Sequence, residues 1–274
     1  MARFERSFAS LQNLDYRKLW WAGTFSFMSV QMQVLLRGVL AWDLTEREGA
    51  LGLVYLCFGI ALLIATPLGG VAADRLPKRR VLVVSQGAIL AAAAGMGTVV
   101  LTDVVQYWML LVAAVTQGVA FGFLGPTRVA FTSEIVGRDQ LGNAITLSLL
   151  SMNGTRVIAP AFAGALAGVV FIGIGGAYVV SAVFSMLSFV LLVRCPPGAT
   201  PKAAGAASPF AQIVDGVRYV SARPHLRRLV VSSFVIIMFG FNYVAFIPAL
   251  VMGEFGLGDG WVGMAAHPGE GVFM

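Results

Sequence analysis

Apolar segments long enough to cross a bilayer occupy most of this 274-residue chain, and short charged loops separate them. A helix needs about 20 apolar residues to span the hydrocarbon core of a membrane. Only 12% of the residues are charged and 58% are hydrophobic, and the mean hydropathy is +0.83. A water-soluble domain carries roughly 25% charged residues. The sequence therefore predicts an all-α membrane protein rather than one or two soluble domains.

Turn residues and charges divide the apolar sequence into seven predicted spans. We expect them at 20–43, 50–73, 80–102, 107–131, 142–168, 177–193 and 229–251. Residues 1–18 form a basic lead-in and residues 132–141 a loop, while Pro160 is expected to break the fifth span. Residues 210–219 have the apolar spacing of an amphipathic helix that lies on the membrane surface.

Composition further divides the chain into three parts. These are a six-helix bundle at 1–193, a basic linker at 194–228 and the start of a second bundle at 229–274. The hydrophobic pattern stops near the end of the chain, where an eighth span would begin. We therefore expect the second bundle to be truncated.

The turn between the second and third spans contains one acid and four bases, from Asp74 to Arg80. Positive loops stay on the cytoplasmic side of a membrane. Bases gather in alternate loops of this chain, and Arg47 is the one base in a loop on the opposite side. We therefore expect a multi-pass protein of a bacterial inner membrane whose N-terminus is cytoplasmic.

Several kinds of chemistry have no support in the sequence. Cys57 and Cys195, like His225 and His267, are too far apart to suggest a metal site, and both cysteines are read as ordinary thiols. No glycine-rich stretch is followed by the Lys-Ser/Thr pair of an ATP-binding loop. We expect no cofactor, no enzymatic activity and no nucleic-acid partner; the bilayer, a small-molecule substrate and protons are the expected partners.

Polar side chains inside the spans are the candidate functional residues. Charged groups within a membrane usually face a cavity or pair with one another, so Arg37 and Arg156 are candidates for contacting an anionic substrate. Asp43 is a candidate partner or proton carrier, although an ordinary interfacial acid is the favoured interpretation. The full set of substrate or coupling candidates is Gln33, Arg37, Asp43, Gln117, Asn153, Arg156 and Asn242.

Three segments resemble the major facilitator superfamily of transporters. Gly70, Asp74, Arg75, Lys78 and Arg79 match its pattern between helices two and three, with Pro77 in place of the usual glycine. The segment from Gly122 through Arg128 to Asn143 and Ala144 is similar to the drug- and siderophore-exporter branch that contains the enterobactin exporter. Pro160 and Gly164 belong to a segment that resembles the helix-five motif of exporters. Gln117 and Gly118 partly match the helix-four motif, in which Ala114 replaces an arginine.

This resemblance implies a six-helix N-terminal bundle, followed by a linker and the first helix of a second half. It also implies a gate in which Asp74 meets a helix of the second half and locks the outward-open state. The favoured function is secondary active transport by alternating access, as a proton-linked antiporter that exports a small amphipathic compound. Two alternatives stay open: a truncated, non-transporting remnant of such a carrier, and a seven-helix receptor, which the orientation disfavours.

Overall fold

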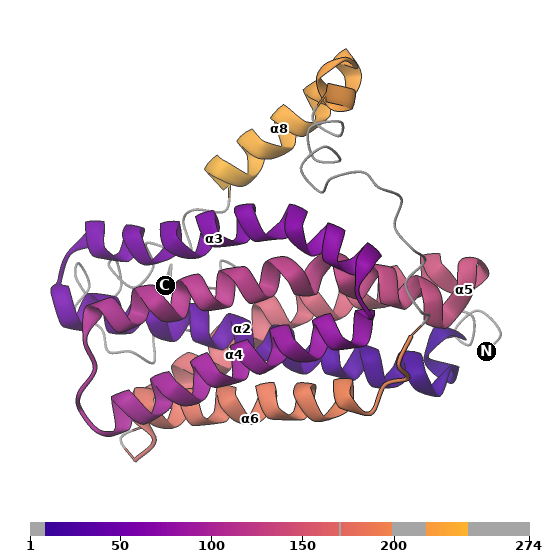
Figure 1. Cartoon of the computed structure of the whole chain (residues 1–274). Coiled ribbons are helices and arrows are strands. Elements are labelled where there is room, and N and C mark those ends of the chain that lie inside the picture. Colours follow the sequence, from indigo (N-terminus) through magenta and orange to yellow (C-terminus); the bar gives the residue numbers. More distant parts are fainter. Residues whose placement is uncertain (1–8, 170, 199–217, 241–274) are drawn as a thin grey trace, which may run out of the picture.

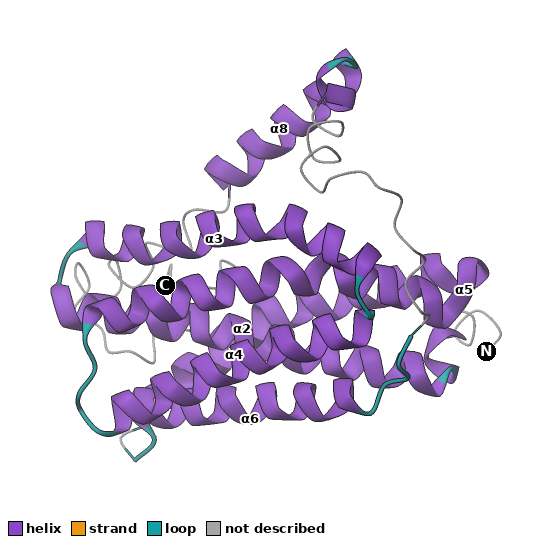
Figure 2. Ribbon diagram, in the orientation of Figure 1, coloured by secondary structure: helices purple, strands orange, loops and turns teal. Residues whose placement is uncertain are grey.

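Helices of the bundle lie side by side in the computed structural model, which describes residues 9–169, 171–198 and 218–240 (Figure 1). The elements are η1 (Ala9–Gln12), α2 (Leu14–Thr45), α3 (Glu48–Arg75), α4 (Lys78–Leu101), α5 (Tyr107–Ala167), α6 (Gly173–Val193) and α8 (Pro224–Gly240). The described residues contain helices and loops and no strand (Figure 2). The predicted all-α class is therefore confirmed.

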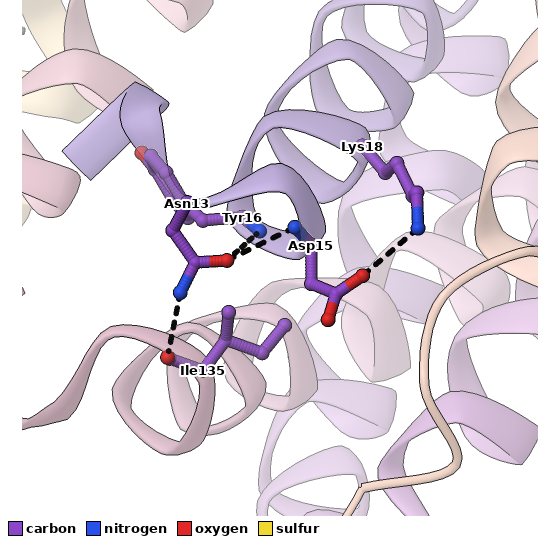
Figure 3. A network of polar contacts seen from close by, with 5 residues as sticks. All are labelled: Asn13, Asp15, Tyr16, Lys18 and Ile135. Carbon is purple, nitrogen blue, oxygen red and sulfur yellow. Dashed lines mark hydrogen bonds and ion pairs between the residues drawn. The ribbon is translucent and has the colours of Figure 1, made fainter.

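Most of the helices begin earlier than the hydrophobic pattern predicts, whereas α5 begins at Tyr107 as predicted. Helix α2 begins at Leu14, within the predicted lead-in, because Asn13 caps it (Figure 3). The Asn13 Oδ1 atom accepts hydrogen bonds from the backbone N–H groups of Asp15 and Tyr16, at 2.9 and 3.2 Å. Its Nδ2 atom donates to the Ile135 carbonyl oxygen at 3.3 Å, so the same side chain fixes the start of α2 against α5.

A single 61-residue element, α5, replaces the predicted fourth and fifth spans. At a rise of 1.5 Å per residue a straight helix of this length would measure about 90 Å, some three times the thickness of the hydrocarbon core. The chain turns at Gly137, whose φ of 71° and ψ of 179° are accessible essentially to glycine alone. We call Tyr107–Val136 the first arm of α5 and Arg138–Ala167 the second arm.

Two local predictions for this region are wrong. Residues 132–141 are helical on both sides of Gly137 rather than a loop, since one glycine suffices for the turn. Pro160 lies inside the second arm and does not break it. Residues 173–176, which lie between the predicted fifth and sixth spans, form the first residues of α6. Residues 199–217 of the linker, with most of the amphipathic segment, and residues 241–274, with Asn242, lie outside the described residues.

Many large apolar side chains lie on the outside of this bundle, and several polar ones are buried inside it. Leu63 and Leu150 are 73% and 63% exposed, whereas Arg37, Gln33 and Gln117 are buried. Four of the described helices, α3, α4, α5 and α6, are long and apolar enough to cross a membrane. This distribution suits a bundle surrounded by lipid, in which polar groups must be satisfied inside.

Small residues bring α3 and the first arm of α5 into backbone contact. A Cβ atom on Gly118 would lie 2.5 Å from the Phe58 carbonyl oxygen, and one on Gly122 would lie 2.6 Å from the Ala65 Cβ atom. A Cβ atom on Gly69 would collide with the Gly122 carbonyl oxygen. Helices pack in lipid chiefly through such close approach, so these glycines determine where α3 lies.

We predict that Gly118→Ala destabilises the bundle by about 1–3 kcal/mol, because the added methyl group overpacks a backbone contact. The matched control is Gly125→Ala, on the same arm, where an added Cβ atom meets nothing within 4 Å. Unfolding of both purified variants in detergent measures the difference. Equal stabilities would contradict this packing.

Candidate functional site

The charged turn between α3 and α4 is held by contacts to two other helices. The Lys78 ammonium lies 2.5 Å from Glu134 Oε1, near the end of the first arm of α5. The Arg79 guanidinium donates to the carbonyl oxygen of Val193, the last residue of α6. The turn therefore joins α4 to the ends of α5 and α6. Lys78 and Arg79 belong to the predicted gating motif, whereas Glu134 was not among the predicted site residues.

Asp74, the acid of that motif, lies in the last turn of α3 and is exposed. Among the described residues it makes no hydrogen bond or ion pair. Gly70 is one helical turn earlier, and an added Cβ atom there would meet nothing within 4 Å. Gly69, rather than Gly70, is the glycine required by packing within the bundle. Gly70 and Asp74 thus share a face that the described bundle leaves open.

Arg37 lies in the middle of the bundle and is 2% exposed. Its Nη2 atom donates to Gln117 Oε1 on the first arm of α5, and its guanidinium lies 5.9 Å from the Phe58 ring centroid. Its Nε and Nη1 atoms, Gln117 Nε2 and Tyr178 Oη are buried without hydrogen-bond partners in the described structure. The structure therefore brings two predicted candidates, Arg37 and Gln117, into contact within an incompletely satisfied polar cluster.

Gln33 belongs to a different polar cluster from Arg37. Its Nε2 atom donates to Ser29 Oγ at 2.9 Å, and that hydroxyl donates to the Ser181 carbonyl oxygen at 2.8 Å. Next to them Gln86 accepts a hydrogen bond from Ser26 at 2.7 Å and donates to Ser185. These bonds join α2, α4 and α6. They give Gln33 a role in helix packing, and a role in substrate contact stays a prediction.

The remaining predicted residues are not gathered around Arg37. Asp43 is exposed near the end of α2, and Asn153 and Arg156 are exposed on the second arm of α5. Arg75 lies in the last turn of α3, and Pro160 and Gly164 lie within the second arm. Their functional roles stay predictions, as does that of Asn242.

Arg128 is the buried cation that the sequence reading missed. It was counted among the cytoplasmic loop bases, but it lies in the first arm of α5 and is 9% exposed. Its guanidinium lies 5.0 Å from the centroid of the Phe27 ring. The motif Pro126-Thr127-Arg128 lies at the end of the predicted span, where a base normally reaches water, so hydropathy alone gave no sign of its burial.

The two cysteines and the acids offer no metal site within the described residues. Cys195, expected in a cytoplasmic loop, is 2% exposed and packs with Leu19, Ala22 and Leu192. Burial raises the pKa of its thiol to about 11, so the thiol is neutral at pH 7.

An apolar exterior, an interior of buried polar groups and several helices of membrane-spanning length define a multi-pass helical membrane protein. The sequence profile of the Major Facilitator Superfamily matches residues 19–273. The chain therefore belongs to this superfamily, whose members are transporters, which confirms the resemblance at the level of the superfamily. None of the curated proteins compared with the chain matches it.

We predict that Gln117→Leu destabilises the protein by about 3 kcal/mol, because it removes the acceptor of a buried guanidinium. The double variant Arg37→Met with Gln117→Leu should recover most of this loss, since removing both partners leaves no buried unpaired charge. Thermal unfolding of the single and double variants measures the coupling. If the two effects simply add, Gln117 is not the partner that stabilises Arg37.

Proposed function

We propose that this protein is a proton-linked secondary transporter that exports a small amphipathic compound by alternating access. Membership of the superfamily supports transport. The proposal of a gate is supported by the arrangement of the charged turn between α3 and α4. Two of its bases are bound within the bundle, Lys78 to Glu134 and Arg79 to Val193, while its acid Asp74 is exposed beside Gly70.

This arrangement suits a gate because the bound and the exposed parts of the turn have different tasks. Lys78 and Arg79 hold the turn in place against α5 and α6. Asp74 lies at the C-terminal end of α3, where the helix dipole is unfavourable for a carboxylate. A positively charged group or a helix N-terminus of a second bundle would stabilise it. If Asp74 contacts this group in one conformation and not in the other, the contact shifts the equilibrium between the two conformations of the carrier.

The proposed orientation places this turn on the cytoplasmic side of a bacterial inner membrane. Arg75, Lys78, Arg79 and Arg80 are concentrated there, and the positive-inside rule assigns such loops to the cytoplasm. The gate would then close the cytoplasmic entrance. Arg37 and Gln117, in the interior of the bundle, are the proposed contacts for substrate or for coupling.

We expect Asp74→Asn to reduce proton-linked efflux about tenfold without lowering stability, because it removes the charge of the gate but no contact within the bundle. Cells that express the chain are loaded with ethidium or with anilinonaphthalene sulfonate, as cationic and anionic amphipathic probes. Efflux is followed by fluorescence with and without a protonophore, and membrane insertion by immunoblotting.

The control is Asp103→Asn, which changes an exposed acid in the loop after α4, at the opposite end of that helix from the charged turn. It should leave efflux unchanged. If Asp74→Asn exports the dyes as fast as the wild type, Asp74 is not part of a gate. Wild-type cells that export neither dye faster than empty cells would contradict the transport proposal for these probes.

A further inference from the structure

A pocket of about 280 Å³ lies between α2 and the two arms of α5. Phe27 contributes from α2, Arg128 and Thr132 from the first arm, and Ser148 and Leu149 from the second arm. A smaller hollow shares Phe27, Arg128, Thr132 and Ser148 with it. These four residues therefore form the common wall of both spaces, and Arg128 is their one charged member.

The guanidinium of Arg128 is held in place without an acceptor. The Cζ atom of the guanidinium lies 5.0 Å from the centroid of the Phe27 ring. A Cβ atom added to Gly23 would lie 3.2 Å from the Arg128 Nη1 atom. Gly23 thus provides the space that the guanidinium occupies. The Nε and Nη2 atoms are buried and have no hydrogen-bond partner in the described structure. An aromatic face stabilises a cation only in part, so two directed donors stay unsatisfied.

Such a group is costly unless something binds it. Arginine keeps its charge in proteins, and an uncompensated buried charge is strongly unfavourable. None of the residues that line the two spaces is acidic. Apart from Arg128 and the Thr132 and Ser148 hydroxyls, the side chains that line the larger pocket are apolar. They include Phe121, Leu124 and Met152. An apolar pocket with a few convergent polar groups is the usual form of a small-molecule site.

We propose that Arg128 anchors the oxyanion of an amphipathic ligand, a carboxylate or phosphate attached to an apolar body, in this pocket. The guanidinium receives the oxyanion, and the Thr132 hydroxyl lies beside it in the wall of the pocket. The apolar body lies along Phe121, Leu149 and Met152. This inference rests on the proposed function and narrows its substrate class to amphipathic anions. It also assigns the anion to a different arginine from Arg37.

The position of the pocket relates it to the charged turn. Glu134, which binds Lys78, is six residues after Arg128 on the same arm, a rise of about 9 Å. The pocket therefore lies toward the end of the bundle that carries Asp74, not at the depth of Arg37 and Gln117. An anion bound at Arg128 would lie close to the proposed cytoplasmic entrance.

The test measures binding rather than transport, so that its failure can be told from failure of the transport proposal. The full chain is placed in phosphatidylcholine nanodiscs, and radiolabelled decanoate is bound at equilibrium. Decanol, with the same chain length and no charge, is the competing control. Decanoate should bind saturably and decanol should compete at least about tenfold more weakly, because only the carboxylate forms charge-assisted hydrogen bonds.

Three variants locate the site. Arg128→Gln should weaken decanoate binding about tenfold or more, whereas Arg138→Gln, which changes an exposed arginine beyond the turn, should leave it unchanged. Leu149→Trp keeps the cation but fills the pocket, and it should also weaken binding. In the absence of ligand, Arg128→Gln should unfold at the same temperature as the wild type or higher, because it removes an unpaired buried charge.

A second set of nanodiscs, which also contain phosphatidylglycerol, distinguishes the two sources of the oxyanion. Unchanged decanoate affinity identifies a small-molecule anion, whereas competition that Arg128→Gln abolishes identifies a lipid phosphate. Wild-type decanoate affinity in Arg128→Gln or Leu149→Trp would overturn the proposal. It would also be overturned by equal binding of decanol, by absent binding of decanoate in the wild type, or by a marked fall in the unfolding temperature of unliganded Arg128→Gln.

Discussion

Two guanidinium groups buried in an apolar bundle are the constraint around which this structure is organised. Each needs acceptors that lipid cannot supply, so the neighbouring helices must provide them or leave the charge unpaired. Gln117 provides one acceptor for Arg37, while Phe27 gives Arg128 only the face of a ring. The first arm of α5 takes part at both sites, and its close packing against α3 requires glycine at 118 and 122.

The turn at Gly137 also determines where the second arm of α5 lies. Because the chain reverses there, the second arm returns alongside α2, where Ala144 and Leu147 accept hydrogen bonds from Tyr16 and Trp20 at 2.8 and 3.0 Å. The same reversal places Ser148 opposite Arg128 and leaves Glu134 at the end of the first arm for Lys78. The short segment of the first arm from Arg128 to Glu134 thus joins the pocket to the charged turn, and Gly137 ends this arm.

Hydropathy predicted the helical class and the centres of the helices, because span length is imposed by the bilayer. It predicted their ends less well. Asn13 starts α2 before the apolar sequence begins, and the polar residues around Gly137 are helical although they read as a loop. A hydropathy average does not register the Asn13 cap or the turn at Gly137, and the two regions are tied together by a hydrogen bond from Asn13 to the distant Ile135. A window of local sequence contains no information about such a partner.

The sequence predicted a candidate site residue where a charged side chain lies well inside a predicted span. Arg37 lies inside a predicted span, six residues from its end, so its burial follows from the sequence, and its contact with Gln117 is the interhelical bond that such a residue requires. Arg128 stands near the end of a span, where snorkelling to water is the ordinary outcome for arginine. Tertiary contacts prevent Arg128 from reaching water, because Gly23 and Phe27 of α2 cover its guanidinium. A charge near a helix end is therefore a loop charge only if no neighbouring helix covers it, and here α2 does.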